Sequence, residues 1–110
     1  MRIADFGQVS IDVRKLEDYC LDPSHPRGRH KARVFQTALG LGRGDAAWLR
    51  DRLLADASAA EATLRSRDRF GIQMQADVTV ARQNRSAVIR TIWIVQEGRP
   101  DVRLVTCWVL

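Results

Sequence analysis

One short segment gathers most of the side chains in this sequence that could act on a phosphate. It reads HPRGRHKAR over residues 25–33 and contains both histidines of the chain. Basic side chains stand at and just before the expected start of a helix near residue 29, namely Arg27, Arg29, His30, Lys31 and Arg33. The helix macrodipole favours anions at that end, so these cations predict a contact with a phosphate or an RNA backbone. The alternative is a solvated basic loop, in which each charge costs roughly a few tenths of a kcal/mol.

The residue types in this segment suggest a specific reaction. Cleavage of RNA by its own 2′-hydroxyl needs a base, an acid and a cation for the charge that develops on the phosphorane. His25 and Lys31 with an arginine fill these roles without metal, because histidine titrates near neutral pH. We therefore predict His25 and Lys31 as catalytic residues and Arg27 and Arg29 as substrate-binding residues. The alternative for His25 is a loop histidine that fixes the turn beside Pro26.

A further arginine lies inside an apolar run, VIRTIWIV over residues 88–95. Alternation along a strand places Arg90 on the face opposite Thr91 and Trp93. Arg90 either extends out of the sheet into water or lines an open concave face and contacts a phosphate. In the second interpretation it joins the substrate-binding arginines. Trp93 and Trp108 are expected in the core rather than as platforms for stacked bases.

Several common catalytic motifs do not occur in the chain. The sequence contains no GxxxxGK[ST], GxGxxG, HExxH or GxSxG, and its acids show no paired catalytic spacing. Cys20 and Cys107 lack the spacing of a metal site, so we expect two buried free thiols. These observations predict neither a cofactor nor a metal site.

Composition fits one globular domain over residues 1–110, with 45% hydrophobic and 28% charged residues. The basic side chains comprise two lysines and sixteen arginines, and the formal net charge is +5. Arginine suits bidentate phosphate contacts, although an arginine-rich composition also follows from a GC-rich genome. No apolar run approaches the roughly 18 residues of a membrane span, and residues 1–13 lack a signal-peptide pattern. We therefore predict a cytoplasmic protein.

The first half of the chain reads as helical. A short edge strand is expected at residues 8–11, followed by a helix to about residue 20 that Asp12 caps and that carries Tyr19 at the edge of its apolar stripe. Turn-forming residues then give a loop, and a second helix is expected over residues 29–39. Asp45 predicts the start of a third helix, whose apolar stripe continues through Leu64 to about residue 65.

The second half reads as strands. Alternating or continuous apolar residues predict strands at 72–80, 87–95 and 102–110, and short turns between them favour antiparallel pairing. The predicted fold class is α+β, with two or three N-terminal helices packed on one face of a three- to four-stranded antiparallel sheet. The other face is expected to remain partly open.

Much of the chain from Lys15 onward resembles an uncharacterised bacterial domain family. The matching pattern is K-L-x-x-Y-x-L-x-x-x-H-P-x-G-x-x-K-A-x-x-F over residues 15–35, with an R-T-x-W-I-V strand over residues 90–95 and an L-V-T-C strand over residues 104–107. The sequence departs from the pattern at Cys20, where leucine is usual, and at Asp22, where asparagine is usual. Members of this family resemble modules at the C-terminal ends of polymorphic toxins, and others stand alone.

The resemblance implies a metal-independent RNase with a fold like that of the barnase–colicin–RelE group. By matching position it adds Thr91 and Thr106 to the catalytic residues, beside His25 and Lys31. The implied partners are RNA and a cognate antitoxin or immunity protein. The alternative function is a non-catalytic binding or adaptor module that docks a protein or a nucleic acid. A third interpretation makes the segment from His25 to Lys31 a purely structural corner.

Overall fold

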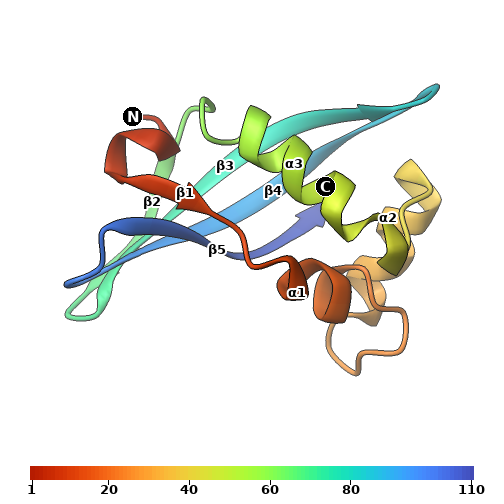
Figure 1. Cartoon of the computed structure of the whole chain (residues 1–110), viewed down its shortest axis with the longest axis horizontal. Helices are drawn as coiled ribbons and strands as arrows, with labels where there is room; N and C mark the ends of the chain where they lie inside the picture. The colour runs from red at the N-terminus through yellow and green to blue at the C-terminus, as the bar shows by residue number, and fades with distance from the viewer.

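The computed structural model describes all 110 residues, Met1–Leu110. Three α-helices, two 3₁₀ turns and one π-helical turn accompany five strands (Figure 1). The helical elements are η1 (Ile3–Phe6), α1 (Val13–Lys15), the π turn η2 (Leu16–Cys20), α2 (Arg29–Leu39), η3 (Arg43–Asp45) and α3 (Ala46–Asp56). The strands are β1 (Gln8–Ser10), β2 (Thr63–Asp68), β3 (Gly71–Arg82), β4 (Arg85–Gln96) and β5 (Asp101–Val109).

The five strands form one mixed sheet in the order β1-β5-β4-β3-β2. Strands β2 to β5 run as the antiparallel meander that short turns favour. Strand β1 pairs parallel with the first residues of β5, so that Val9 lies opposite Val102. The α+β class is confirmed, but the expected sheet of three or four antiparallel strands is wrong. The sheet also contains β2, which was not predicted, and its edge strand β1 runs parallel to β5.

The expected third helix is too long at its C-terminal end. Helix α3 ends at Asp56, and the segment predicted to continue it becomes the edge strand β2. Leu64 is 53% exposed on that strand rather than part of a buried stripe. Asp68 closes the β2–β3 turn by accepting hydrogen bonds from the backbone N–H groups of Phe70 and Gly71. Pairing with β3 therefore outweighs the helix propensity of the alanine-rich sequence.

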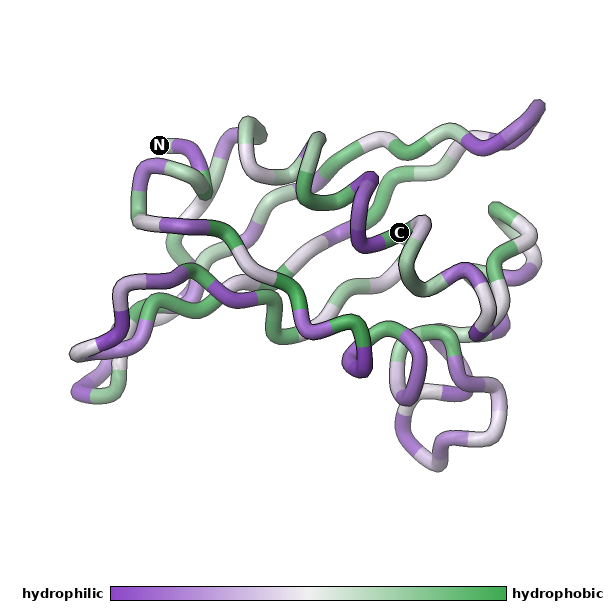
Figure 2. The backbone as a smooth tube through the Cα atoms, viewed as in Figure 1, coloured by the Kyte–Doolittle hydropathy of each residue, from purple (hydrophilic) through white to green (hydrophobic).

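The helices cover the sheet face that holds the core. Leu16, Phe35 and Leu49 from the helices share one buried cluster with Met74 and Trp93 from the strands. Figure 2 shows apolar residues along the stretches of helix and strand that meet there. The arrangement of helices on the sheet agrees with the α+β class, and no helix has the length and apolar character that crossing a membrane requires.

The π turn at the end of the first helix shapes the region that follows. Asp12 caps α1 by accepting from the backbone N–H of Arg14, as expected. The last turn then widens, and the N–H of Leu21 bonds to the carbonyl of Leu16. This widening places Tyr19 next to the loop that leads into α2, which is the connection on which the candidate site depends.

Candidate functional site

Lys31, in the first turn of α2, lies at the centre of a cluster of hydroxyl and aromatic groups. Its Nζ donates to Thr106 Oγ1 at 3.1 Å and lies 3.5 Å from the hydroxyl of Tyr19. The same Nζ sits 5.0 Å from the ring centroid of Tyr19 and 5.2 Å from that of Trp108. No aspartate or glutamate forms an ion pair with it. The side chain of Lys31 is thus held by uncharged partners, and no acid within the chain is paired with it.

Strand β5 supplies two members of this cluster from its second half. Strand β1 pairs with β5 only as far as Arg103, so helical segments rather than a strand face the later residues. A register shift against β4 leaves Val105 without a partner and sets Thr106 opposite Ile92. Thr106 and Trp108 are two residues apart and project to the same side, toward Lys31. The irregularity in β5 therefore aims a hydroxyl and an indole at one ammonium.

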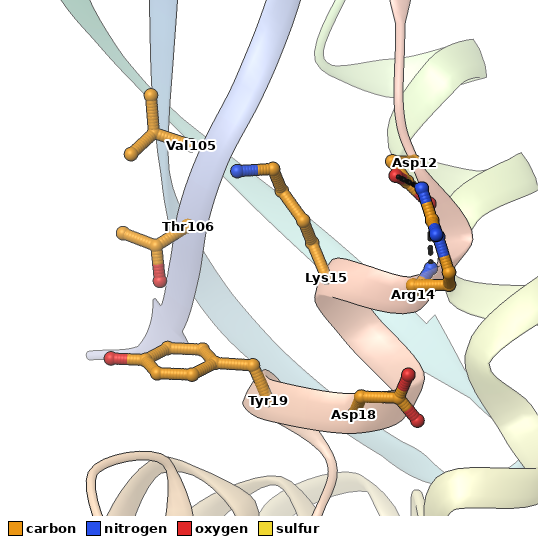
Figure 3. Close-up of a pocket in the computed structure, with 7 residues that line it drawn as sticks. All are labelled: Asp12, Arg14, Lys15, Asp18, Tyr19, Val105 and Thr106. Carbon is orange, nitrogen blue, oxygen red and sulfur yellow. Dashed lines mark hydrogen bonds and ion pairs between the residues drawn. The ribbon is translucent and has the colours of Figure 1, made fainter.

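Two surface hollows are lined by members of this cluster. A groove of about 600 Å³ runs between the first helix and β5 and includes Lys15, Tyr19 and Thr106 in its lining. Figure 3 shows Tyr19 extending beneath Thr106 while Lys15 reaches toward β5. A second hollow of about 360 Å³ lies beside Lys31 and Trp108. A ligand in either hollow would meet the ammonium or its hydrogen-bond partners.

The acids around the groove are already engaged by arginines. Asp12 forms an ion pair with Arg14 at 2.8 Å, and hydrogen bonds from this arginine lower the pKa of Asp12 to about 2. Asp18 forms an ion pair with Arg43 at 2.7 Å. Lys15, on the same rim, has no acidic partner. The unpaired charge at the groove is therefore positive.

His25 contacts this region through its aromatic ring, and one of its two ring nitrogens is already hydrogen-bonded to the backbone. Its Nδ1 accepts the backbone N–H groups of Arg27 and Gly28, both at 3.0 Å. This fixes the turn before α2 and places the proton of the neutral ring on Nε2. The ring meets Tyr19 edge to face, with centroids 4.7 Å apart. His25 thus supports the position of Tyr19. The hydrogen bonds of its Nδ1 are those expected from the alternative interpretation, in which this histidine fixes the turn.

Two further residues predicted from the sequence lie outside the cluster. Thr91 is fully buried, where its hydroxyl donates to the carbonyl of Ala76 at 2.6 Å and accepts from the indole of Trp93 at 2.7 Å. Arg90 forms two hydrogen bonds to the carboxylate of Asp77, at 3.0 and 2.9 Å. The structure therefore brings Lys31 and Thr106 together and leaves Thr91 and Arg90 in other networks.

The predicted basic residues Arg27, Arg29 and His30 lie at the N-terminal end of α2, just before Lys31 in the chain. Arg27, Arg29 and His30 are exposed, and neither arginine has an acidic partner. His30 also lines the smaller hollow beside Lys31. These side chains are free to approach a polyanion, whereas Lys31 is fixed in place.

Sequence reasoning missed the two aromatic members of the cluster. Tyr19 was expected at the edge of a helical stripe, and Trp108 was expected in the core, although it is only half-buried. The signal available for Tyr19 was its place in the motif over residues 15–35, which also contains Lys31. For Trp108 the period of the strand was informative, because alternation puts it on the same face as Thr106.

Both cysteines lie directly behind the cluster. They are buried and form no disulfide, as expected. The sulfur of Cys20 lies 3.7 Å from Thr106 Oγ1. The neighbouring Cys107, with smaller contributions from Thr106 and Lys31, lowers the pKa of Cys20 to about 6. The neighbouring Cys20 and burial raise the pKa of Cys107. Cys20 is therefore the thiol of the pair that ionises first.

Comparisons with known proteins give one match. The sequence model of a family described as a domain of unknown function (DUF6883) matches residues 2–110. No curated protein and no solved structure matches the chain. Within the chain itself, no group of three or more His, Cys, Asp or Glu residues is placed to hold a metal ion.

Proposed function

Because the chain belongs to the DUF6883 family of domains of unknown function, we propose its function from the site alone: a metal-independent RNase of the bacterial toxin type. One observation carries the proposal, the Lys31 ammonium held by Tyr19, Thr106 and Trp108 with no acidic partner. Such a cation favours binding of a phosphate oxygen, because an anion would complete its coordination.

The chemistry follows from the groups around that cation. The 2′-hydroxyl of a ribose attacks the adjacent phosphorus, the bond to the 5′-oxygen breaks, and the products end in a 2′,3′-cyclic phosphate and a 5′-hydroxyl. Lys31 stabilises the charge that grows on the phosphoryl oxygens. The Tyr19 hydroxyl, 3.5 Å from Nζ, relays the proton: it accepts the proton of the attacking 2′-hydroxyl as it gives its own to the leaving 5′-oxygen. Thr106 orients the phosphate by a hydrogen bond.

The remaining residues take supporting roles in this proposal. The rings of Tyr19 and Trp108 offer stacking surfaces for the bases on either side of the phosphate. Arg27 and Arg29 attract the RNA backbone at the N-terminal end of α2. His25 is a positioning residue, because its ring packs against Tyr19 and its Nδ1 is bound to the turn. Thr91 and Arg90 have no role in cleavage here, since their polar groups are already bonded elsewhere.

The test compares two variants that each remove one positive charge from α2. Purified wild-type protein, Lys31→Ala and Arg33→Ala are incubated with total RNA in excess EDTA, and the products are analysed for 2′,3′-cyclic phosphate ends. We expect the wild type to cleave, Lys31→Ala to lose about 100-fold or more, and Arg33→Ala to change by less than about three-fold. Arg33 is exposed and forms no ion pair, so it controls for charge alone.

Two outcomes would contradict the proposal. Unchanged cleavage by Lys31→Ala, with thermal unfolding showing both variants folded, would remove the reaction from this cluster. RNA binding by the wild type without cleavage would instead support the second candidate, a non-catalytic binding module. That candidate is favoured by the exposed edge strand β2 and its turn, where Arg65, Arg67 and Arg69 have no acidic partners.

A further inference from the structure

Strand β2 lies at one edge of the sheet and has no neighbour on its outer side. Its backbone pairs with β3 alone, and no backbone hydrogen bond outside the helices and strands involves residues 63–68. All six residues of the strand are exposed. Because alternate N–H and C=O groups of an edge strand point away from the sheet, β2 presents unpaired donors and acceptors to solvent. Figure 1 shows this edge toward the end of the molecule opposite α2.

The side chains along this edge carry unpaired positive charge. Arg65 and Arg67 on β2 and Arg69 in the following turn are exposed and form no ion pair. The acids nearest to them in the sequence are already engaged. Glu61 binds the N-terminal ammonium at 2.8 Å, and Asp68 accepts the backbone N–H groups that close the turn. An anionic strand laid along β2 would therefore meet arginines that are free to pair with it.

Apolar surface accompanies this charge. Leu64 is 53% exposed and Phe70, in the turn, is 63% exposed. Leu64 lies opposite Met74, which is part of the buried core. Arg67 lies opposite Ile72, which packs against the same core. Since residues opposite each other in a sheet share a face, Leu64 and Arg67 both project on the side that the helices cover. The edge thus offers an apolar and a cationic contact on one side.

We propose that β2 is a docking edge for an acidic, extended peptide segment of a partner protein, which adds to the sheet as a strand beside β2. The backbone of this segment pairs with the outward N–H and C=O groups of β2. Its carboxylates lie near Arg65, Arg67 and Arg69, and an apolar side chain covers Leu64. The proposal concerns a surface apart from Lys31 and does not rest on RNA cleavage.

The charge and the backbone of the edge favour this occupant over two others. A second copy of the chain, paired through its own β2, would bring the arginines of both copies together, and like charges on neighbouring strands are destabilising. RNA phosphates would pair with the arginines but leave the outward carbonyls of β2 without donors. Residues 63–68 also contain no aromatic ring on which a base could stack. An acidic peptide satisfies both the side chains and the backbone.

The first experiment measures the binding of fluorescein-labelled peptides to the full chain by fluorescence anisotropy. The probe peptide alternates glutamate with valine, and two matched peptides carry N-methyl groups on either its odd or its even backbone nitrogens. We expect the probe to bind saturably, one methylated peptide to bind equally well, and the other to bind at least about ten-fold more weakly, because only alternate N–H groups of an added strand face β2. No saturable binding up to about 1 mM probe, or equal binding of the two methylated peptides, would overturn the proposal.

Two charge reversals then locate the peptide on the protein. Arg67→Glu should weaken binding of the probe by about ten-fold, because an attraction is replaced by a repulsion. Arg33→Glu makes the same change at an exposed position of α2 and should alter binding by less than about two-fold. Equal effects of the two reversals, with circular dichroism showing both variants folded, would contradict docking at β2.

Hydrogen exchange distinguishes the three occupants. With the probe bound, the amides of residues 63–68 should exchange more slowly than in the free protein. Protection of these amides by single-stranded RNA but not by the probe, measured in the Lys31→Ala background, would overturn the proposal in favour of RNA. Protection that grows with protein concentration in the absence of probe would assign the edge to a second copy of the chain. None of these readouts involves RNA cleavage, so this proposal and the RNase proposal fail separately.

Discussion

Lys31 is held in a way that is unusual for a half-buried lysine. Placing an ammonium away from water is unfavourable unless other groups replace the lost hydration. Here the replacements are two hydroxyls and two aromatic faces, which stabilise the cation without neutralising it. Since no carboxylate occupies this position, the side chain of Lys31 has room for an anion, which is what the proposed function requires of it.

Thr91 is the residue for which a structural role is clearest. Thr91→Val keeps the shape of the side chain but leaves the Trp93 indole N–H without a partner in the core. We expect a loss of about 1–3 kcal/mol in the free energy of unfolding, measured by urea denaturation, and unchanged RNA cleavage by the folded protein. The matched control is Thr79→Val on the exposed face of β3, which should change stability by less than about 0.5 kcal/mol. A loss of cleavage without a loss of stability would return Thr91 to the catalytic residues.

At the scale of the elements, local patterns predicted the α2 helix and the three long strands well. Helix α2 occupies residues 29–39 as expected, because Gly40 ends it in a left-handed conformation with φ 67°. Strand β3 shows the expected alternation, with Met74, Ala76 and Val78 buried. These elements were predictable because neighbouring residues in the sequence determine their periodicity and ends.

The elements that sequence reasoning misjudged depend on distant partners. Strand β2 has no buried positions and exists because β3 offers a free edge, whereas the alanine-rich residues before it favour a helix. The candidate site likewise combines residues that the sequence predicted with contacts that only the fold creates. Lys31 and Thr106 were both predicted, but their contact joins residues 75 positions apart. Tyr19 and Trp108 were recognised as members of the site only when the fold placed their rings beside Lys31.

The turn between the first helix and α2 sets the distance from Tyr19 to Lys31. Gly28, the N-cap of α2, lies so close to the Tyr19 carbonyl that an added Cβ would sit 2.2 Å from the oxygen. We expect Gly28→Ala to destabilise the protein by about 1–3 kcal/mol in urea denaturation. Because the clash moves Tyr19 away from Lys31, RNA cleavage should fall even under conditions where the variant remains folded.

The chain offers a matched glycine as control. Gly44 has open space around its Cα, with no heavy atom within 4 Å of an added Cβ. Gly44→Ala should therefore leave stability unchanged or raise it by up to about 1 kcal/mol, and cleavage should be unaffected. Equal effects of the two substitutions would contradict the close packing of the turn against η2.

On the scale of the whole molecule, positive charge is distributed unevenly. Seven of the sixteen arginines form ion pairs with acids, namely Arg14, Arg43, Arg50, Arg52, Arg82, Arg90 and Arg99. Five of the nine unpaired arginines form two groups, Arg27 and Arg29 at the start of α2 and Arg65, Arg67 and Arg69 along β2 with its turn. Figure 1 places α2 and β2 toward opposite ends of the molecule, whose longest extent is 37 Å. These two groups of unpaired arginines therefore lie apart from each other along the molecule.

Arg27 and Arg29 are the unpaired arginines next to Lys31 in the chain, so RNA bound at Lys31 should lose phosphate contacts when they are removed. We expect Arg27→Ala/Arg29→Ala to lower the slope of log affinity against log salt by about 1.4, since each phosphate contact with a single strand contributes about 0.7. The control Arg50→Ala/Arg52→Ala removes the same charge from arginines already paired with Asp51 and Asp56, and its slope should match the wild type. Filter binding of a single-stranded RNA by the Lys31→Ala background measures affinity without cleavage. Equal slopes for the two double variants would mean that net charge alone attracts RNA. A slope that is reduced only in Arg65→Ala/Arg67→Ala would instead locate the RNA-binding surface on β2.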